Sequence, residues 1–229
     1  MPDKSLATAT IVFDLDGTLV DTAPDLVGAT NHVLAGLSLP PRDALELRPW
    51  ISFGARRMIV EALRSSQRSL SETETDALMV PFLDYYEANI ARESRPFPHA
   101  VATVEALRRA GARLAICTNK REALSLRLLA ALGMVDLFDA IVGRDTLPVS
   151  KPHPGHLTGS ITRAGGTTDR AIMVGDSGVD IATARAAGVP VVAFTFGYSD
   201  VPIASLSPDA VLDDYRHLIP TLHRLAPAA

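Results

Sequence analysis

The chain has 229 residues, of which 47% are apolar, and its formal net charge is −4. A chain of this length holds one large domain or one domain with a modest insertion, and this composition excludes a disordered protein. The negative net charge gives no electrostatic basis for binding nucleic acid or an anionic membrane. We therefore expect neither a nucleic-acid partner nor a membrane partner.

Three further features bear on where the protein resides. Its single cysteine, Cys117, cannot form an internal disulfide, which favours a reducing cytosol. Residues 1–5 lack the basic and apolar segments that begin a signal peptide. No apolar run approaches the roughly 20 residues that span a bilayer. We expect a soluble, cytoplasmic protein that is either a monomer or a homodimer.

Short apolar segments that end in turn signals alternate with helical patterns along most of the chain. The expected strands are residues 10–15, 113–117, 140–142, 171–174, 190–194 and 210–212. The expected helices are 100–110, 121–132, 153–164 and 179–187, and the last three end just before Gly133, Gly165 and Gly188, where glycine is a common stop. Strands that alternate with helices predict a parallel sheet with helices on both faces.

The alternation is interrupted once, between the first and the second expected strand. Apolar residues recur there at helical spacing, with one face made by Leu26, Val27, Val33, Leu34 and Leu37 and another by Met58, Ile59, Ala62 and Leu63. Ser71 and Glu74 fit the capping box of a further helix that carries Leu78, Phe82 and Tyr86. So long a connection indicates an inserted subdomain rather than a loop. We expect an α/β protein with a Rossmann-like parallel sheet core, residues 1–20 and 94–229, and an inserted α-helical cap domain, residues 21–93.

The first candidate motif lies where the first expected strand ends. Asp14 and Asp16 are two residues apart and enter a turn at Gly17, so both carboxylates can converge on one cation or one phosphorus atom. Taken alone, the pair also fits a solvated acidic turn. An EF-hand loop is excluded, because Leu19 occupies the position of its required glycine and a strand precedes the motif.

Two polar motifs follow the next strands. Thr118 and Asn119 offer a hydroxyl and an amide suited to phosphate oxygens, although the cap of an ordinary helix contains the same residue types. Lys151 precedes Pro152, which stiffens the turn and keeps the lysine out of helical dihedral angles. Of the 22 Lys and Arg residues only three are lysines, and two of these, Lys120 and Lys151, lie in the two motifs.

The fourth motif lies between a buried strand and the helix that follows it. Asp176 stands at the end of the strand, and Asp180 lies in the first turn of the helix. Ser177 could be read as a serine nucleophile, but the nucleophile-elbow pattern fails because Val179 replaces its final glycine. We therefore do not expect Ser177 to be catalytic.

All four motifs follow strands of one parallel sheet or lie in the connection to the next strand. Ligands of open α/β sheets bind beyond the carboxyl ends of the strands. One pocket is therefore expected to hold Asp14, Asp16 and Asp176 around a hard cation, with Lys151 and Thr118 opposite. Ligation by carboxylates alone favours Mg²⁺, which keeps water molecules and accepts a substrate phosphate as a further ligand. A small phosphorylated metabolite is the expected partner.

In order and spacing, the motifs resemble those of the phosphatase branch of the haloacid dehalogenase superfamily: Asp14-x-Asp16-Gly17-Thr18, Thr118-Asn119, Lys151-Pro152 and Gly175-Asp176-x-x-x-Asp180. The resemblance covers nearly the whole chain. It implies that Asp14 is a nucleophile that forms an aspartyl phosphate, and that Asp16 is the general acid and base. It further implies that Thr118 and the backbone of Asn119 hold phosphoryl oxygens, while Lys151 neutralises Asp14.

The same resemblance implies a magnesium site. Asp14 and Asp176 would bind Mg²⁺ through their carboxylates, Asp16 would contribute its backbone carbonyl, and Asp180 would support the water shell of the ion. The presence of Asp16 favours a phosphatase over a dehalogenase, because dehalogenases lack this carboxylate.

Within the superfamily, the chain is similar to the phosphoglycolate phosphatases in residues 19–26, in residues 50–55, and in Thr118-Asn119-Lys120 and Phe196-Gly197-Tyr198. This similarity implies that 2-phosphoglycolate is hydrolysed to glycolate and phosphate. Phe53 departs from the pattern, since the commoner form has a second glycine there. A phosphatase or pyrophosphatase of other or broad specificity, a phosphotransferase of the β-phosphoglucomutase type, and a non-enzymatic phosphate sensor remain alternatives.

The cap segment around Gly54 is a candidate for substrate binding. Ser52, Phe53 and Gly54 are expected to open a helix, so their backbone N–H groups could face a small anionic leaving group. Arg56 and Arg57 could add positive charge, but adjacent helical residues cannot both point inward. The segment could equally serve only as a helix cap with both arginines solvated.

Overall fold

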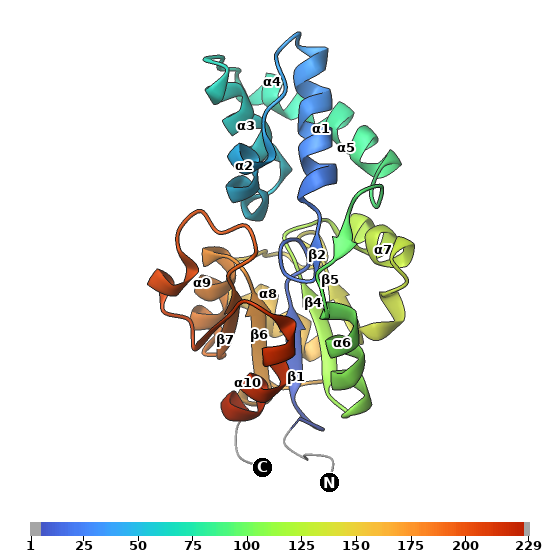
Figure 1. Cartoon of the computed structure of the whole chain (residues 1–229), viewed down its shortest axis with the longest axis vertical. Helices are drawn as coiled ribbons and strands as arrows, with labels where there is room; N and C mark the ends of the chain where they lie inside the picture. Colours follow the sequence, from blue (N-terminus) through green and yellow to red (C-terminus); the bar gives the residue numbers. More distant parts are fainter. Residues whose placement is uncertain (1–5, 227–229) are drawn as a thin grey trace.

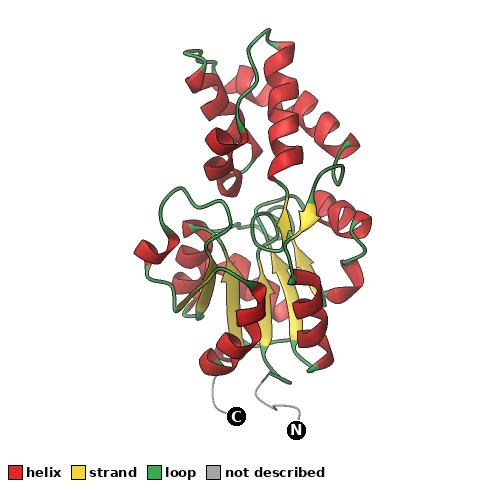
Figure 2. Cartoon of the chain, in the orientation of Figure 1, coloured by secondary structure: helices red, strands yellow, loops and turns green. Residues whose placement is uncertain are grey.

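The computed structural model describes residues 6–226, and residues 1–5, on which the expectation about a signal peptide rests, lie outside the described part. Six strands form a sheet in the order β5-β4-β1-β6-β7-β8, with every neighbouring pair parallel (Figures 1 and 2). They are β1 (Thr10–Phe13), β4 (Arg113–Cys117), β5 (Ala140–Val142), β6 (Ala171–Gly175), β7 (Val191–Phe194) and β8 (Ala210–Leu212). The predicted parallel α/β sheet is confirmed.

Helices cover both faces of this sheet, because the residues of each strand alternate between the faces. Ile11 and Phe13 belong to an apolar cluster that they share with helices on one face, namely α6 (Ala100–Arg109), α7 (Glu122–Ala131) and α10 (Leu218–Leu225). Val12 belongs to a second cluster, shared with α8 (Pro154–Arg163) and α9 (Gly178–Ala187) on the other face. The sequence patterns did not indicate α10. No helix among the described residues is both long and apolar enough to cross a membrane.

A helical cap stands beyond the carboxyl ends of the strands (Figure 1). It consists of α1 (Ala23–Gly36), α2 (Ala44–Leu47), α3 (Ala55–Ser65), α4 (Glu72–Ala77) and α5 (Met79–Ala88), and α1 packs against α3 and α5. The predicted capping box of Ser71 and Glu74 is present. The single helix expected after it is wrong, because the chain forms two helices that meet at Leu78. Pro81 explains the division, since proline lacks the N–H that would continue the helical bonding to Ala77.

Two short strands connect the sheet to the cap. β2 (Val20–Asp21) and β3 (Arg95–Pro96) pair in antiparallel orientation where the chain leaves the core and returns to it. Asp25, in the first turn of α1, is buried, and its carboxylate accepts hydrogen bonds from the N–H groups of Glu93 and Ser94 and from the Ser94 hydroxyl, the last at 2.6 Å. The domain boundary expected after residue 20 falls inside β2, because this strand consists of Val20 and Asp21. The division into core and cap stays a proposal.

The hydrogen bonds of Asp25 predict a stabilising role at this junction. Asp25→Ala removes the acceptor of two backbone N–H groups and is expected to lower the free energy of unfolding by about 2–3 kcal/mol. Urea denaturation of the variant measures this loss. Asp84→Ala, at an exposed position of α5, is the matched control, and an effect of Asp25→Ala no larger than that of the control would contradict the assignment.

Candidate active site

Asp14 lies at the centre of the carboxyl edge of the sheet, directly after β1. Its N–H donates to the Val174 carbonyl at 2.9 Å, which keeps the residue in line with β6. Its carboxylate is buried and accepts a hydrogen bond from the Leu15 N–H at 2.7 Å. The ammonium nitrogen of Lys151 lies 3.0 Å from the same oxygen. The side chain of Asp14 is therefore held in place and paired with a cation.

Lys151 comes from the connection between β5 and α8, and its side chain is only 1% exposed. Besides Asp14, its Nζ contacts Asp180 Oδ1 at 2.7 Å. The Asn119 amide donates to the Lys151 carbonyl at 3.2 Å, which joins this connection to the loop after β4, and the peptide bond to Pro152 is cis. Burial alone would lower the pKa of Lys151, but the carboxylates of Asp14 and Asp180 raise it above its usual range. The ammonium group stays charged.

Asp176 follows β6 and is fully buried. Its carboxylate accepts a hydrogen bond from the Thr18 hydroxyl at 2.6 Å and another from the Tyr198 N–H at 2.7 Å. Asp180 forms a capping box with Ser177 at the start of α9, and its Oδ2 accepts from the Ser177 hydroxyl at 2.6 Å. Ser177 is therefore a helix cap, which supports its exclusion as a nucleophile.

Asp14, Asp176 and Asp180 form an acidic cluster in which one carboxylate oxygen of each lies within 4.8 Å of the others. Burial raises the pKa of Asp14 to about 7, with Lys151 acting in the opposite direction and Asp180 and Asp16 adding to the rise. Burial and the neighbouring Asp180 also raise the pKa of Asp176. Excess negative charge of this kind fits the binding of a cation. Both oxygens of Asp180 and both oxygens of Asp176 accept hydrogen bonds, so hydrogen bonding alone does not distinguish the direct ligands from a residue of the water shell.

Thr118 and Asn119 follow β4, beside the acidic cluster. Thr118 is buried, and its Oγ1 accepts a hydrogen bond from the Lys120 N–H at 3.1 Å, which leaves the hydroxyl proton free to donate to a ligand. The Oδ1 atom of Asn119 is buried without a hydrogen-bond partner among the described residues. The expected phosphate-binding side chains thus lie at the same edge of the sheet as Asp14.

Asp16 is placed apart from the acidic cluster. Its carboxylate pairs with Lys120, whose Nζ lies 2.9 and 3.1 Å from the two oxygens. Burial alone would lower the pKa of Lys120, but Asp16 and Tyr86 raise it above its usual range. Two sequence signals pointed to Lys120 without giving it a role, namely the scarcity of lysine in the chain and the similarity of Thr118-Asn119-Lys120 to phosphoglycolate phosphatases.

A cavity of about 110 Å³ lies between these core residues and the cap. On the core side it is lined by Asp14, Asp16, Thr118, Asn119 and Lys120. The cap contributes mainly apolar side chains: Leu26, Ile51, Met58, Met79, Phe82 and Tyr86. Such a mixture of an apolar wall with a few polar groups is typical of a small-molecule site.

Gly54 lines this cavity, but its N–H is not available to a ligand. The N–H donates to the Ile51 carbonyl at 2.8 Å, which corrects the expectation that it faces a leaving group. Gly54 has a φ of 90°, a conformation that favours glycine. Arg56 also lines the cavity and pairs with Asp76 at 2.7 Å, and Arg57 pairs with Glu61 at 2.8 Å. The cap segment therefore presents one of its two arginines to the cavity.

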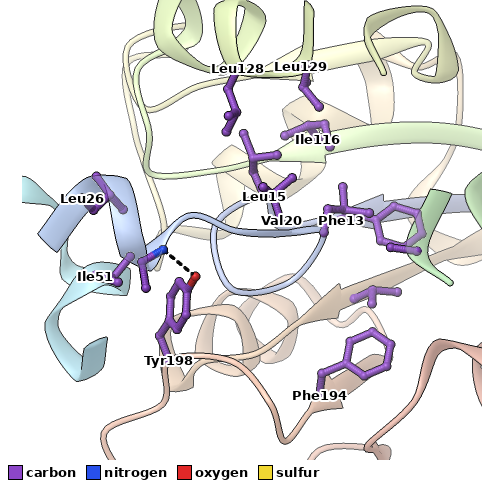
Figure 3. Close-up of a cluster of buried hydrophobic side chains, with 14 of the residues drawn as sticks. Phe13, Leu15, Val20, Leu26, Ile51, Ile116, Leu128, Leu129, Phe194 and Tyr198 are labelled. Atoms are coloured by element: carbon purple, nitrogen blue, oxygen red, sulfur yellow. Dashed lines mark hydrogen bonds between the residues drawn. The ribbon is translucent and has the colours of Figure 1, made fainter. Parts of the chain in front are cut away.

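Tyr198 connects the acidic cluster to the cap, a role that the sequence analysis did not identify. Its N–H donates to Asp176, and its hydroxyl donates to Asp21 Oδ1 at 2.6 Å. The same hydroxyl accepts hydrogen bonds from the N–H groups of Thr22 and Ala23 at 2.8 and 3.0 Å. Figure 3 shows the ring with a dashed line at its hydroxyl. The similarity of the segment 196–198 to phosphoglycolate phosphatases was the only sequence signal for it.

Comparison with known proteins gives consistent matches over most of the chain. Residues 11–194 match a family model described as haloacid dehalogenase-like hydrolase. A phosphoglycolate phosphatase of Mesorhizobium japonicum is 50% identical over 205 residues, which cover 90% of each chain. One of Agrobacterium fabrum is 46% identical over 211 residues, which cover 92% of this chain and 91% of the relative.

A solved structure adds to these matches. The crystal structure of a predicted phosphoglycolate phosphatase from Haemophilus somnus has a TM-score of 0.87 and 34% identity, and the match covers 94% of this chain and 98% of that one. The family match spans the helical cap and the strands of the sheet up to β7, and the relatives cover about nine tenths of the chain, so the predictions of the family and of an enzyme are confirmed. The chain is an enzyme that belongs to the haloacid dehalogenase-like hydrolase family.

Proposed function

We propose that the protein is a Mg²⁺-dependent phosphate monoester hydrolase that forms an aspartyl phosphate on Asp14. The observation that carries this proposal is the contact between the buried Asp14 carboxylate and the Lys151 ammonium, next to the buried Asp176. A carboxylate that attacks an anionic phosphate needs such compensating charge. The relatives named phosphoglycolate phosphatase favour the same chemistry.

The acidic cluster suits the proposed cofactor. Asp14 and Asp176 would hold Mg²⁺ through their carboxylates, Asp16 through its backbone carbonyl, and Asp180 through the water shell. A donor set made of oxygen atoms matches this hard cation, and the buried excess of negative charge favours it. When bound, the ion supplies positive charge that offsets the repulsion between the phosphate and the nucleophile.

The remaining steps follow from the positions of the side chains. Asp14 attacks the phosphorus atom while the bond to the alcohol oxygen breaks. Asp16, which enters the step in its protonated form, gives its proton to the leaving alcohol and takes one back from the water that hydrolyses the aspartyl phosphate. Lys151 favours the ionised form of Asp14, and the Thr118 hydroxyl and the Asn119 backbone bind the phosphoryl oxygens. The cap excludes bulk water during the first step.

We further propose 2-phosphoglycolate as the substrate, because the cavity contains free groups for a second anion. Arg121 and Arg144 both line it, and no carboxylate among the described residues pairs with either guanidinium group. Arg144 Nη1 is 3.9 Å from the position that a Cβ on Gly54 would occupy, which places it beside the cap segment. Ser52, in that segment, has a buried hydroxyl without a partner among the described residues. Arg144 and Ser52 can thus bind the substrate carboxylate.

Substitutions of Asp14 and Asp16, the two carboxylates of the first motif, are expected to have different effects on activity. Asp14→Asn should remove measurable phosphate release, because an amide does not attack phosphorus. Asp16→Asn should lower turnover by roughly 10²–10⁴-fold, the usual contribution of general acid–base catalysis. Phosphate release and the melting temperature are measured for both variants. A fully active and folded Asp14→Asn protein would contradict the mechanism.

Magnesium should stabilise the folded protein independently of turnover. Binding to the native cluster raises the free energy of unfolding by about 2.7 kcal/mol at a concentration 100 times Kd. Thermal melts with and without Mg²⁺ measure this increase, which Asp176→Asn should largely abolish. Asp169→Asn, at an exposed position, is the control and should keep it. Equal stabilisation of wild type and Asp176→Asn would show that the cation binds elsewhere.

Arg144 should determine the preference for a substrate that carries a carboxylate. The measurement is the ratio of kcat/KM for 2-phosphoglycolate to kcat/KM for 2-hydroxyethyl phosphate, in which a CH₂OH group replaces the carboxylate. Arg144→Met should lower this ratio by about tenfold or more, or about 1.4 kcal/mol. Arg163→Met, at an exposed position of α8, should leave it unchanged. A wild-type ratio near one would refute the substrate proposal but leave the phosphatase proposal intact.

A further inference from the structure

Lys120 is a buried lysine whose ammonium group is engaged by the side chain of Asp16. Its side chain is 5% exposed and that of Asp16 is 14% exposed, and Nζ lies within hydrogen-bond distance of both carboxylate oxygens, at 2.9 and 3.1 Å. A contact to both oxygens fixes the rotation of the carboxylate as well as its position. Without such a contact, an aspartate at the wall of a cavity has several staggered rotamers available.

The main chain of Lys120 is anchored on both sides. Its N–H donates to the Thr118 hydroxyl oxygen at 3.1 Å, and its carbonyl accepts from the Arg144 N–H at 2.9 Å. The lysine side chain therefore extends from a fixed point on the loop after β4. Lys120 lines the cavity, and its ammonium group contacts Asp16.

The cap supplies the other side of this contact. The Tyr86 ring, on α5, lies with its centroid 4.6 Å from Lys120 Nζ. Tyr86 is itself only 1% exposed, and its hydroxyl has no hydrogen-bond partner among the described residues. The ring therefore contributes its face to the ammonium group, an interaction that is stronger away from water. Asp16, Lys120 and Tyr86 form a continuous contact from the catalytic loop to the cap.

We propose that Lys120 is a positioning residue that holds the Asp16 carboxylate for proton transfer, and that Tyr86 makes this placement depend on the cap. The inference rests on the acid–base role of Asp16 in the proposed function. Lys120 acts through Asp16 and does not touch the reacting phosphorus. Its loss should impair those reactions that need a proton from Asp16 and spare those that do not.

The leaving group distinguishes these two kinds of reaction. An alkyl phosphate must have its leaving alcohol protonated, whereas p-nitrophenyl phosphate releases a stable phenolate that needs little help. Because kcat/KM reports events up to the first irreversible step, the ratio of its values for the two esters isolates the acid function. Lys120→Met keeps the length and the apolar stem and removes the charge. We expect it to lower the alkyl-to-aryl ratio by about tenfold or more.

Asp16→Asn is the reference for this experiment. It should lower the same ratio, and the double variant Asp16→Asn/Lys120→Met should lower it no further, because Lys120 has no effect once its target is gone. Lys120→Arg, which keeps the positive charge, should restore part of the ratio. A general loss of structure would lower kcat/KM for both esters alike, and its effect would add to that of Asp16→Asn.

Several outcomes would overturn the inference. If Lys120→Met leaves the ratio unchanged, or raises KM for both esters equally, the lysine binds substrate or is merely structural. Should Lys120→Met not fold, Tyr86→Leu takes its place, with a smaller but selective fall in the ratio expected and an unchanged ratio counting against the inference. If Asp16→Asn itself shows no selective loss for the alkyl ester, the acid–base proposal fails instead, which separates the two claims.

Discussion

Three carboxylates and one ammonium group share a buried space at the edge of the sheet, and the surrounding structure supplies partners for each of them. Taking an ion out of water costs several kcal/mol, so such a group persists only where hydrogen bonds and opposite charge compensate for the loss. Lys151 bridges Asp14 and Asp180, and Asp176 is bound by the Thr18 hydroxyl and a backbone N–H. Negative charge still exceeds positive charge, which gives this edge its capacity for a cation.

Close approach of the backbone to this cluster depends on two glycines. Gly17 has a φ of 84°, and a Cβ there would lie 2.5 Å from an oxygen of Asp176. A Cβ on Gly197 would also overlap the Asp176 carboxylate. The loop that carries Gly197 continues into Tyr198, whose hydroxyl holds the start of α1. The acidic cluster and the base of the cap are therefore parts of one hydrogen-bonded unit.

The sheet and most helices of the core could be predicted from the sequence because their signals are local. Apolar strands such as 113–117 and glycine stops such as Gly188 depend on few neighbours. The convergence of Asp14, Thr118, Lys151 and Asp176 also followed, since the carboxyl ends of parallel strands meet at one edge. The division of the helix after Ser71 was missed because the apolar residues keep their helical spacing across Pro81.

The contacts between distant segments could not be predicted in this way. Lys120 pairs with Asp16 across 104 positions of sequence, and Tyr198 binds Thr22 across 176. Neither pairing follows from a periodic pattern, because each joins loops that come together only in the folded protein. The Gly54 N–H was misjudged for a related reason, since a short helical turn before α3 already uses it.

The central claim is that the phosphoryl group passes through a covalent bond to Asp14. Asp16→Asn, which should slow hydrolysis of the intermediate, is mixed with p-nitrophenyl phosphate and Mg²⁺ and then reduced with borohydride. Reduction converts an acyl phosphate to a primary alcohol, so a peptide mass spectrum should show homoserine in place of aspartate at position 14. Turnover that continues without any modification at this position, or with the modification at another carboxylate, would contradict the account.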